Sequence, residues 1–354
     1  MLVTLLVLLA AGSFAADAPP PATVTVTVKP EGDKLAARWP DAKGAKQALT
    51  ADFPTGAIAA AEVYHFDKVA LIAALGERLT AWATESAPGV SVVVNGPDLT
   101  MKATKTNAAG IESQIATANA QKEVLWAALL AEHHIGRVGP GQLQYDHARI
   151  AAESVAAVRP LVDALGSTAD PRAFAERALT LVQGIPAEAL TRDTFASPLA
   201  LLREQHGDAD EKSTLFAALV RAAAPELPLA VLTMRDHAIV GLGIPAVVGD
   251  RTVTVDGVAW VVADPAGPYL HPLGRLGPRA DMVQLTVRKV PAAMTAPAPV
   301  PTLVAPAPPA PPATPGAPAP AAPVAPGAAA PAPPAPAAPP APAAPPAPAA
   351  PPAP

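Results

Sequence analysis

An imidazole and a carboxylate lie at the ends of two predicted strands in the C-terminal half of the chain. His237 stands near the start of an apolar run that continues to Leu242, and Asp264 directly follows the second half of a predicted hairpin, residues 258–263. An imidazole that is oriented by a carboxylate can activate a nucleophile for acyl transfer. His237 and Asp264 are therefore the first candidates for a site.

A helix start upstream has the features that activate a thiol, but it lacks the thiol. Asp208 is a good N-cap, and Glu211 three residues later completes a capping-box pattern before an Ala- and Leu-rich helix. Ala209 falls in the first turn, where the helix terminus carries about half a positive charge and would stabilise a thiolate. The chain contains no Cys. Neither Ala209 nor any other residue can supply a thiol nucleophile.

The order of these motifs resembles bacterial transglutaminase-like domains, which have a papain-type cysteine-hydrolase fold. That family shows G-D-C at a helix start, then a strand beginning H-A, then an Asp at the end of the next strand. This chain has G-D-A-D-E-K-S at 207–213, H-A-I-V at 237–240 and D-P at 264–265. Its segment L-V-Q-G-I-P at 181–186 is similar to the family's upstream helix end. The resemblance covers residues 170–290, about one third of the chain.

The resemblance implies a role for each matching position. His237 corresponds to the family's imidazole, Asp264 to its orienting carboxylate, and Ala209 to its nucleophilic Cys. A methyl group cannot attack a carbonyl, so we predict an inactive member of the family, a pseudoenzyme that serves as a non-catalytic binding or scaffolding domain. Ser213 lies one turn further along the helix, about 6 Å deeper along the axis, and is not expected to replace the thiol.

Several roles remain open for the His237–Asp264 pair. The two residues could simply satisfy each other as a buried polar pair, or they could line a groove that still binds a peptide or protein ligand. They could also hold a metal together with His206 or His271 and support a hydrolase with non-thiol chemistry, since His and carboxylate ligands suit zinc. The chain has no compact motif such as H-E-x-x-H. We expect no metal and no cofactor.

We interpret Gln183 and the pair His133-His134 as polar ends of helices rather than as site residues. Gln183 could line the groove by comparison with the family, although a solvated helix terminus is the favoured interpretation. His133 and His134 are adjacent on a predicted helix, so their side chains point about 100° apart and cannot chelate one ion together. We interpret them as a polar helix end.

The elements around these residues predict an α+β fold. In residues 170–290 we expect a transglutaminase-like core, in which the helix that bears position 209 packs on an antiparallel sheet. Helices are predicted at 173–183 and from 209 to 221, and strands at 229–233, 236–242, 252–255 and 258–263.

Residues 23–165 are predicted to form a smaller α+β module, and no motif indicates what it binds. Period-two alternation at 23–28 favours a strand, and residues 63–66 are a second strand candidate. Helices are expected at 69–84, 109–134 and 146–165, and a hairpin at 90–103 with an Asn95-Gly96 turn.

Both ends of the chain indicate an exported protein. Residues 1–15 have the apolar run and the small residues of a signal peptide cleaved after Ala15, although no Lys or Arg precedes the run; a buried N-terminal strand or helix is the alternative. The run is too short to span a bilayer. We therefore expect a periplasmic or secreted protein without a transmembrane segment in the mature chain.

Residues 291–354 are almost wholly Pro and Ala, with no charged residue, and hold more than half of the chain's 47 prolines. Such a sequence favours an extended, disordered spacer, which could contact a cell-envelope component. The net charge of −5 and the lack of a basic cluster exclude nucleic acid as a partner class. If the function lies elsewhere, the module at 23–165 is the remaining candidate, as an assembly domain.

Overall fold

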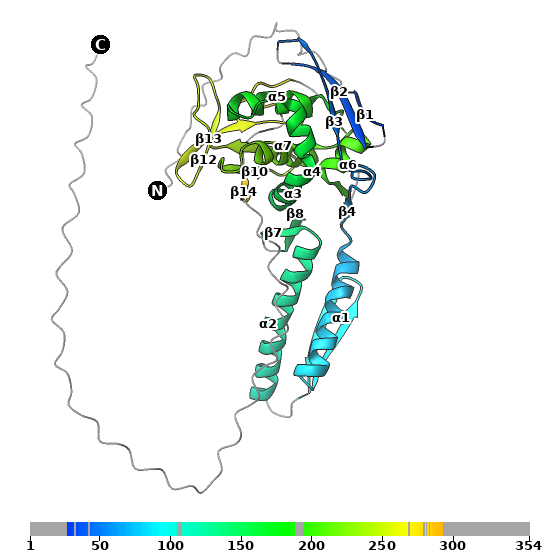
Figure 1. The fold of residues 1–354 in the computed structure, drawn as a ribbon. Helices are drawn as coiled ribbons and strands as arrows, with labels where there is room; N and C mark the ends of the chain where they lie inside the picture. The colour runs from blue at the N-terminus through cyan, green and yellow to red at the C-terminus, as the bar shows by residue number, and fades with distance from the viewer. Residues whose placement is uncertain are drawn as a thin grey trace, which may run out of the picture. The chain divides into compact units, whose positions relative to one another are not determined.

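The computed structural model describes residues 27–292, except for positions 32, 42, 105–107, 140, 188–193, 268–269, 279, 281 and 283. The predicted signal peptide, residues 23–26 of the predicted first strand, and the predicted tail from residue 293 lie outside these residues. The described part mixes helices with antiparallel strands, which confirms the predicted α+β class (Figure 1). Within it, no helix is both long and apolar enough to cross a membrane.

Seven helices and fourteen strands are formed by the described residues. The helices are α1 (Lys68–Ser86), α2 (Ala108–Glu132), α3 (His147–Glu153), α4 (Val155–Leu165), α5 (Pro171–Gly184), α6 (Pro198–Glu204) and α7 (Ala209–Ala223). The strands are β1 (Thr27–Glu31), β2 (Lys34–Pro40), β3 (Lys46–Asp52), β4 (Val63–His65), β5 (Val90–Asn95), β6 (Asp98–Ala103), β7 (Ile135–Gly139), β8 (Gln142–Tyr145), β9 (Thr194–Ala196), β10 (Leu229–Thr233), β11 (Ala238–Leu242), β12 (Thr252–Val255), β13 (Val258–Ala263) and β14 (Thr286–Lys289).

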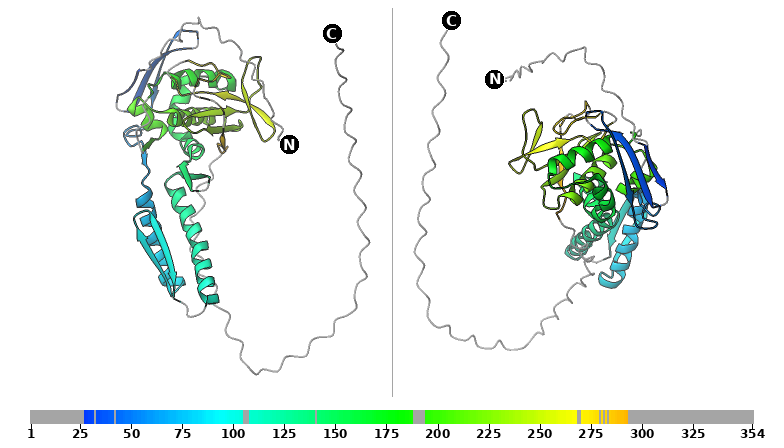
Figure 2. Two further views of the ribbon diagram at one scale, coloured as in Figure 1. Left: turned by 180° about the vertical axis from the view of Figure 1, so that it is seen from behind. Right: turned by 45° about the horizontal axis from the view of Figure 1, so that its top comes forward.

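The largest sheet has five antiparallel strands in the order β12-β13-β11-β10-β14. Its three middle strands are almost entirely buried, which explains why they read as continuous apolar runs in the sequence. Helix α7 packs against β10 and β11, and α5 packs against α7. Figures 1 and 2 show these green helices beside the yellow-green sheet.

Helix α7 begins and ends with well-satisfied backbone groups. The Asp208 side chain accepts hydrogen bonds from the backbone N–H groups of Asp210 and Glu211, and the Glu211 side chain accepts one from the Asp208 N–H. The predicted capping box is therefore confirmed. At the other end, the Arg221 guanidinium donates to the carbonyls of Leu227 and Val290. The start of α7 is thus capped, and its last turn is tied to the residues that flank β10 and β14.

The main hydrophobic core draws on both sides of residues 165–170, where the sequence suggested a boundary between two parts. The three-stranded sheet β1-β2-β3 contributes Leu35, Ala37 and Phe53 to the same buried cluster as α5 and α7. The Trp39 indole N–H donates to the Thr180 hydroxyl of α5 at 3.1 Å. This sheet contacts α4, α5 and α6, as Figure 2 shows from two sides. Sequence reasoning missed β2 and β3.

A second hydrophobic cluster is formed by residues between 66 and 145. Helices α1 and α2 pack together through Leu79, Trp82 and Leu129, and the β5–β6 hairpin covers them. Asp67 caps α1 by accepting hydrogen bonds from the N–H groups of the next turn. Helices α1 and α2 lie side by side in Figures 1 and 2.

Three predicted elements differ in the structure. The helix expected at 146–165 is divided at Ser154 into α3 and α4; buried residues recur at helical spacing on both sides of the break, so the periodicity could not reveal it. The segment at 136–141, which the sequence suggested would only break the helix, contributes residues 136–139 to β7 of the β7–β8 hairpin. In the β5–β6 hairpin Asn95 pairs with Asp98, so the loop is Gly96-Pro97, with Gly96 at a φ of +58°.

Candidate functional site

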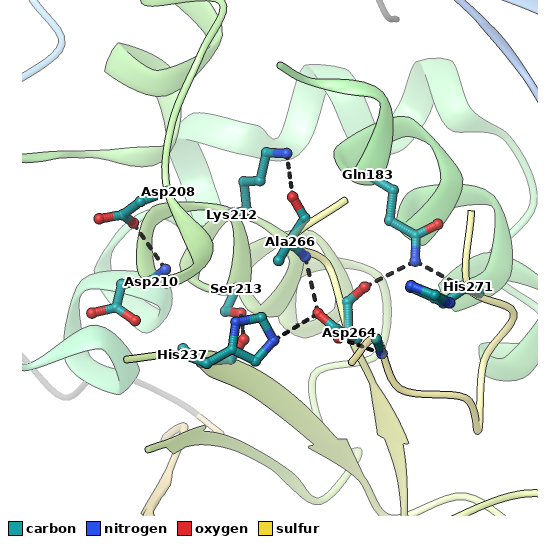
Figure 3. Close-up of polar contacts among 11 residues, drawn as sticks. Gln183, Asp208, Asp210, Lys212, Ser213, His237, Asp264, Ala266 and His271 are labelled. Atoms are coloured by element: carbon teal, nitrogen blue, oxygen red, sulfur yellow. Dashed lines mark hydrogen bonds and ion pairs between the residues drawn. The ribbon is translucent and has the colours of Figure 1, made fainter. Parts of the chain in front are cut away.

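The antiparallel register brings His237 and Asp264 to the same edge of the sheet. His237 directly precedes β11 and Asp264 directly follows β13, and these neighbouring strands run in opposite directions. His237 Nε2 lies 3.1 Å from Asp264 Oδ1, and both side chains are buried. Figure 3 shows the pair facing each other below the start of α7. The structure thus brings together two of the three residues that the sequence singled out.

The Asp264 carboxylate is held by three hydrogen bonds. Besides the imidazole, the backbone N–H of Ala266 donates to Oδ1 at 3.2 Å and that of Gly277 donates to Oδ2 at 2.8 Å. Burial acts to raise the pKa of Asp264, but the hydrogen bonds from His237, Gly277 and Ala266 outweigh it and hold the pKa below its usual value. Asp264 is therefore an ionised, acceptor-only partner that orients the imidazole.

The loop after Asp264 is clamped onto the end of α5 by Gln183. The Gln183 amide donates to the carbonyls of Asp264 and His271, both at 2.8 Å (Figure 3). Gly267, at a φ of +58°, lies so close that a Cβ there would be 2.2 Å from the Gln183 carbonyl oxygen. Gln183 is fully buried. Its favoured interpretation as a solvated helix terminus is wrong, because the distant loop 264–271 covers the helix end.

Helix α7 begins at Ala209, which lies on the helix face that meets β11. Ser213, one turn later, donates its hydroxyl hydrogen to the carbonyl of Ala238 at 2.9 Å, and Ala238 follows His237 directly. Residues four apart share a helix face. Ala209 therefore lies on the same face, one turn closer to the helix terminus, and it is only partly buried. The first residue of α7 therefore has only a methyl group on the side that faces the sheet edge at His237.

Two acids beside position 209 are in a less favourable environment than Asp264. Burial raises the pKa of Asp210 to about 6, and the nearby His237 imidazole opposes the rise. Burial also raises the pKa of Asp208, with Asp210 adding to the effect. His147, at the start of α3, places Nε2 3.6 Å from Asp210 Oδ2. Burial lowers the pKa of His147 to about 4, so this imidazole is neutral near pH 7.

A buried lysine lies one turn into α7. Lys212 is fully buried, and its ammonium group donates to the carbonyl of Ala266 at 2.6 Å, on the loop that follows Asp264 (Figure 3). Burial lowers the pKa of Lys212 to about 7, although Asp264 and Asp208 oppose this shift. Sequence reasoning did not single out Lys212, Asp210 or His147. Their spacing from Asp208 and their burial become apparent only once α3, α7 and the loop are packed together.

Cavities connect this site to the β7–β8 hairpin. A cavity of about 210 Å³ has Asp210 and His147 on one side and residues of β7 and β8, together with Phe66, on the other. A larger cavity of about 670 Å³ shares Phe66, Leu143 and Gln144 with it and extends to the end of β10. The small cavity at the site and the larger cavity are therefore neighbours along the β7–β8 hairpin.

Among the other sequence candidates, His271 lies near Asp264: a Cβ added at Gly277 would be 3.0 Å from Asp264 Oδ2 and 3.1 Å from His271 Nε2. The described residues contain no group of three or more His, Asp or Glu side chains that could hold a metal ion, so the site considered for His237 and Asp264 with His206 or His271 does not form. His134 lies beyond the end of α2, with Nε2 2.5 Å from Glu153 Oε2.

Comparisons with protein-family models, curated proteins and solved structures found no match to this chain.

Proposed function

We propose that this chain is an exported, transglutaminase-like pseudoenzyme, which binds a peptide or protein partner in the cleft where acyl transfer would otherwise occur. Its Pro/Ala-rich segment 291–354 acts as a spacer in the cell envelope, and the protein acts in the periplasm or outside the cell. The observation that carries the proposal is the His237–Asp264 pair beside the start of α7, where position 209 is Ala.

Acyl transfer by this arrangement needs a nucleophile, a base and a group that orients the base. His237 and Asp264 can fill the last two roles, but Ala209 cannot fill the first. Ser213 is fully buried and its hydroxyl is engaged with the Ala238 carbonyl, so it is not available to attack a substrate. The arrangement supports binding without turnover.

The retained polar residues also have a structural use in a non-catalytic protein. Asp264, Gln183 and Lys212 together tie the loop after β13 to α5 and α7. This loop forms one boundary of the site. Loss of the nucleophile leaves these contacts intact, so the cleft can persist as a binding surface after catalysis is lost.

Restoring the thiol tests the proposal directly. In Ala209→Cys the helix terminus and the imidazole both favour the thiolate, so alkylation by iodoacetamide at pH 7 should be about tenfold faster than that of free cysteine. The matched control is Ala209→Cys combined with His237→Gln, which keeps the helix terminus and removes the base. Its rate should fall towards that of free cysteine. A rate for Ala209→Cys no faster than that of free cysteine would contradict the assignment.

A bulky residue at the same position tests the binding role. Ala209→Trp should abolish the capture of a partner from native envelope extract, whereas Ala209→Ser should retain it, because a hydroxyl adds little volume. Equal capture by both variants would place the binding surface elsewhere in the chain.

A further inference from the structure

The groove that leads away from the site differs in charge from the rest of the protein. The 670 Å³ cavity lies between the β7–β8 hairpin and the end of β10, and among its described lining residues the only charged ones are Lys68 and Arg235. The other described lining residues are neutral: Phe66, Val138, Gly141, Gln142, Leu143, Gln144, Thr233, Met234, Gln284 and Thr286. The whole chain carries a net charge of −5.

A second cavity of about 440 Å³ continues the groove on the other side of the hairpin. The two cavities share Lys68, Gly141, Gln142 and Leu143. The second cavity adds Lys122 and Arg137, together with one acid, Glu123. Arg137 Nη1 lies 2.8 Å from Glu123 Oε2, so another lining residue of the same cavity neutralises the charge of this acid.

The second cavity also offers an apolar surface. Ile72 and Leu75 of α1, Leu99 of β6 and Trp126 of α2 line it. Aromatic and aliphatic side chains in a concave site are the usual anchors for an apolar side chain of a partner. The described lining of the two cavities thus has four basic residues against one acid, Glu123, which leaves a net positive charge beside a hydrophobic pocket.

We propose that this groove binds an acidic peptide segment of a partner protein, with carboxylates at Lys68 and Arg235 and an apolar side chain in the pocket at Trp126. The inference deepens the proposed function and rests on it, because the groove shares the lining residues Phe66, Leu143 and Gln144 with the small cavity at Asp210. Complementary charge supplies the selectivity for an acidic partner. The neutral polar residues, such as Gln142 and Gln284, can bond to the peptide backbone.

The exposure and contacts of Lys68 and Arg235 indicate that both can bind carboxylates of a peptide. Arg235 has 93% of its side chain exposed and its Nε lies 3.9 Å from Oδ2 of Asp236, which is 79% exposed; a surface ion pair at this separation contributes little. Lys68 is exposed at the start of α1. Both side chains can therefore turn to a ligand at small cost.

The test uses the full chain and two fluorescein-labelled peptides of equal length, one of alternating Leu and Glu and one of alternating Leu and Lys. Fluorescence anisotropy at low ionic strength should show the Leu–Glu peptide binding at least about tenfold more tightly, with the difference shrinking as salt is added. Equal affinities, or a preference for the Leu–Lys peptide, would overturn the proposal. The second outcome would point instead to Asp210 as the dominant charge.

Two charge-reversal variants locate the binding site. Lys68→Glu with Arg235→Glu should remove the preference for the acidic peptide, and both residues are exposed, so the fold should survive. The control makes the same charge change away from the groove, at the exposed Lys43 and Lys46 of the β2–β3 hairpin, and should leave the preference within about twofold. Equal effects of the two double variants would show a non-specific charge effect and overturn the groove assignment.

The outcomes separate the groove from the proposed function. Acidic-peptide binding that depends on Lys68 and Arg235, without activation of the thiol in Ala209→Cys, would retain the groove and reject the transglutaminase-like assignment. An activated thiol without peptide preference would do the reverse.

Discussion

The two sides of the His237 imidazole differ in how well their acids are satisfied. On one side, Asp264 accepts three hydrogen bonds and its pKa is held down despite burial. On the other side, burial raises the pKa of both Asp208 and Asp210. Asp208 caps α7, whereas the Asp210 side chain has, among the described residues, the neutral His147 at 3.6 Å and the nearby His237, which opposes the rise in its pKa.

The difference indicates which half of the site has a fixed geometry. Fixing a carboxylate with several donors orients the imidazole and costs little when every partner is present. The Asp210 side opens instead to a cavity, where a ligand rather than the protein can complete the contacts. We infer that the Asp264 side serves the fold and the Asp210 side faces the partner. Each of the following substitutions tests that division.

The largest effect is expected where the Asp264 loop meets α5. Gly267→Ala puts a Cβ 2.2 Å from the Gln183 carbonyl oxygen at a positive φ, so the loop must move, and the free energy of unfolding should fall by about 4 kcal/mol. The matched control is Gly257→Ala, which has a similar positive φ of +79° and no atom within 4 Å of the new Cβ. It should cost only about 1 kcal/mol. Urea unfolding measures both, and equal losses would show that the loop is not clamped.

A smaller effect should follow from changing the carboxylate itself. Asp264→Asn keeps the shape but places an amide NH₂ or a weaker acceptor against His237, Ala266 and Gly277, so stability should fall by about 3 kcal/mol. The same change on the other side, Asp210→Asn, should cost less than about 1 kcal/mol, because it removes a poorly partnered acid. Should Asp210→Asn prove the more damaging variant in urea unfolding, the division between the two sides would be wrong.

Local patterns predicted the elements that bear the site. The capping box at Asp208 and Glu211 marked the start of α7, and strands β10, β12 and β13 have the predicted bounds because short apolar runs and the Asp256-Gly257 turn delimit them. The pairing that joins His237 to Asp264 is not a hairpin: β11 pairs with β13, while β12, which lies between them in the sequence, forms the edge of the sheet. The assignment to a transglutaminase-like family stays a prediction.

Features that depend on distant contacts could not be predicted. Strands β2 and β3 alternate buried and exposed residues, but Ala at both kinds of position hides the period: Ala37 is buried and Ala36 exposed. Nothing near Gln183 or Lys212 in the sequence shows that the loop 264–271 covers them. His147 follows a helix cap at Asp146, a signal for the helix start but not for its contact with Asp210.

The smallest effect concerns how stability changes with pH on the two sides. A folded-state pKa of about 6 for Asp210 lies above its value in the unfolded chain, so the folded state binds more protons between about pH 4 and 6, and this acid lowers stability as pH rises through that range. Asp264 acts in the opposite sense, because its folded pKa is lowered: its contribution is present above its ordinary pKa and is lost as pH falls below it. Burial lowers the pKa of His147 to about 4, so the contribution of His147 to stability also falls as pH falls below its ordinary pKa. The Asp210 side chain is 40% exposed, and solvent screening reduces its effect to about 1 kcal/mol.

As pH rises from 4 to 7, the free energy of unfolding of Asp210→Asn should therefore increase by about 1 kcal/mol relative to that of the unchanged chain. Urea unfolding at several pH values measures this difference. The matched control is Asp236→Asn, which makes the same change at an acid with 79% of its side chain exposed and provides the reference profile. A difference that stays constant with pH would mean that Asp210 is as well solvated as Asp236. Asp210 would then not be an unusual acid in the small cavity, whereas the contacts of Asp264 and Gln183 would be unaffected.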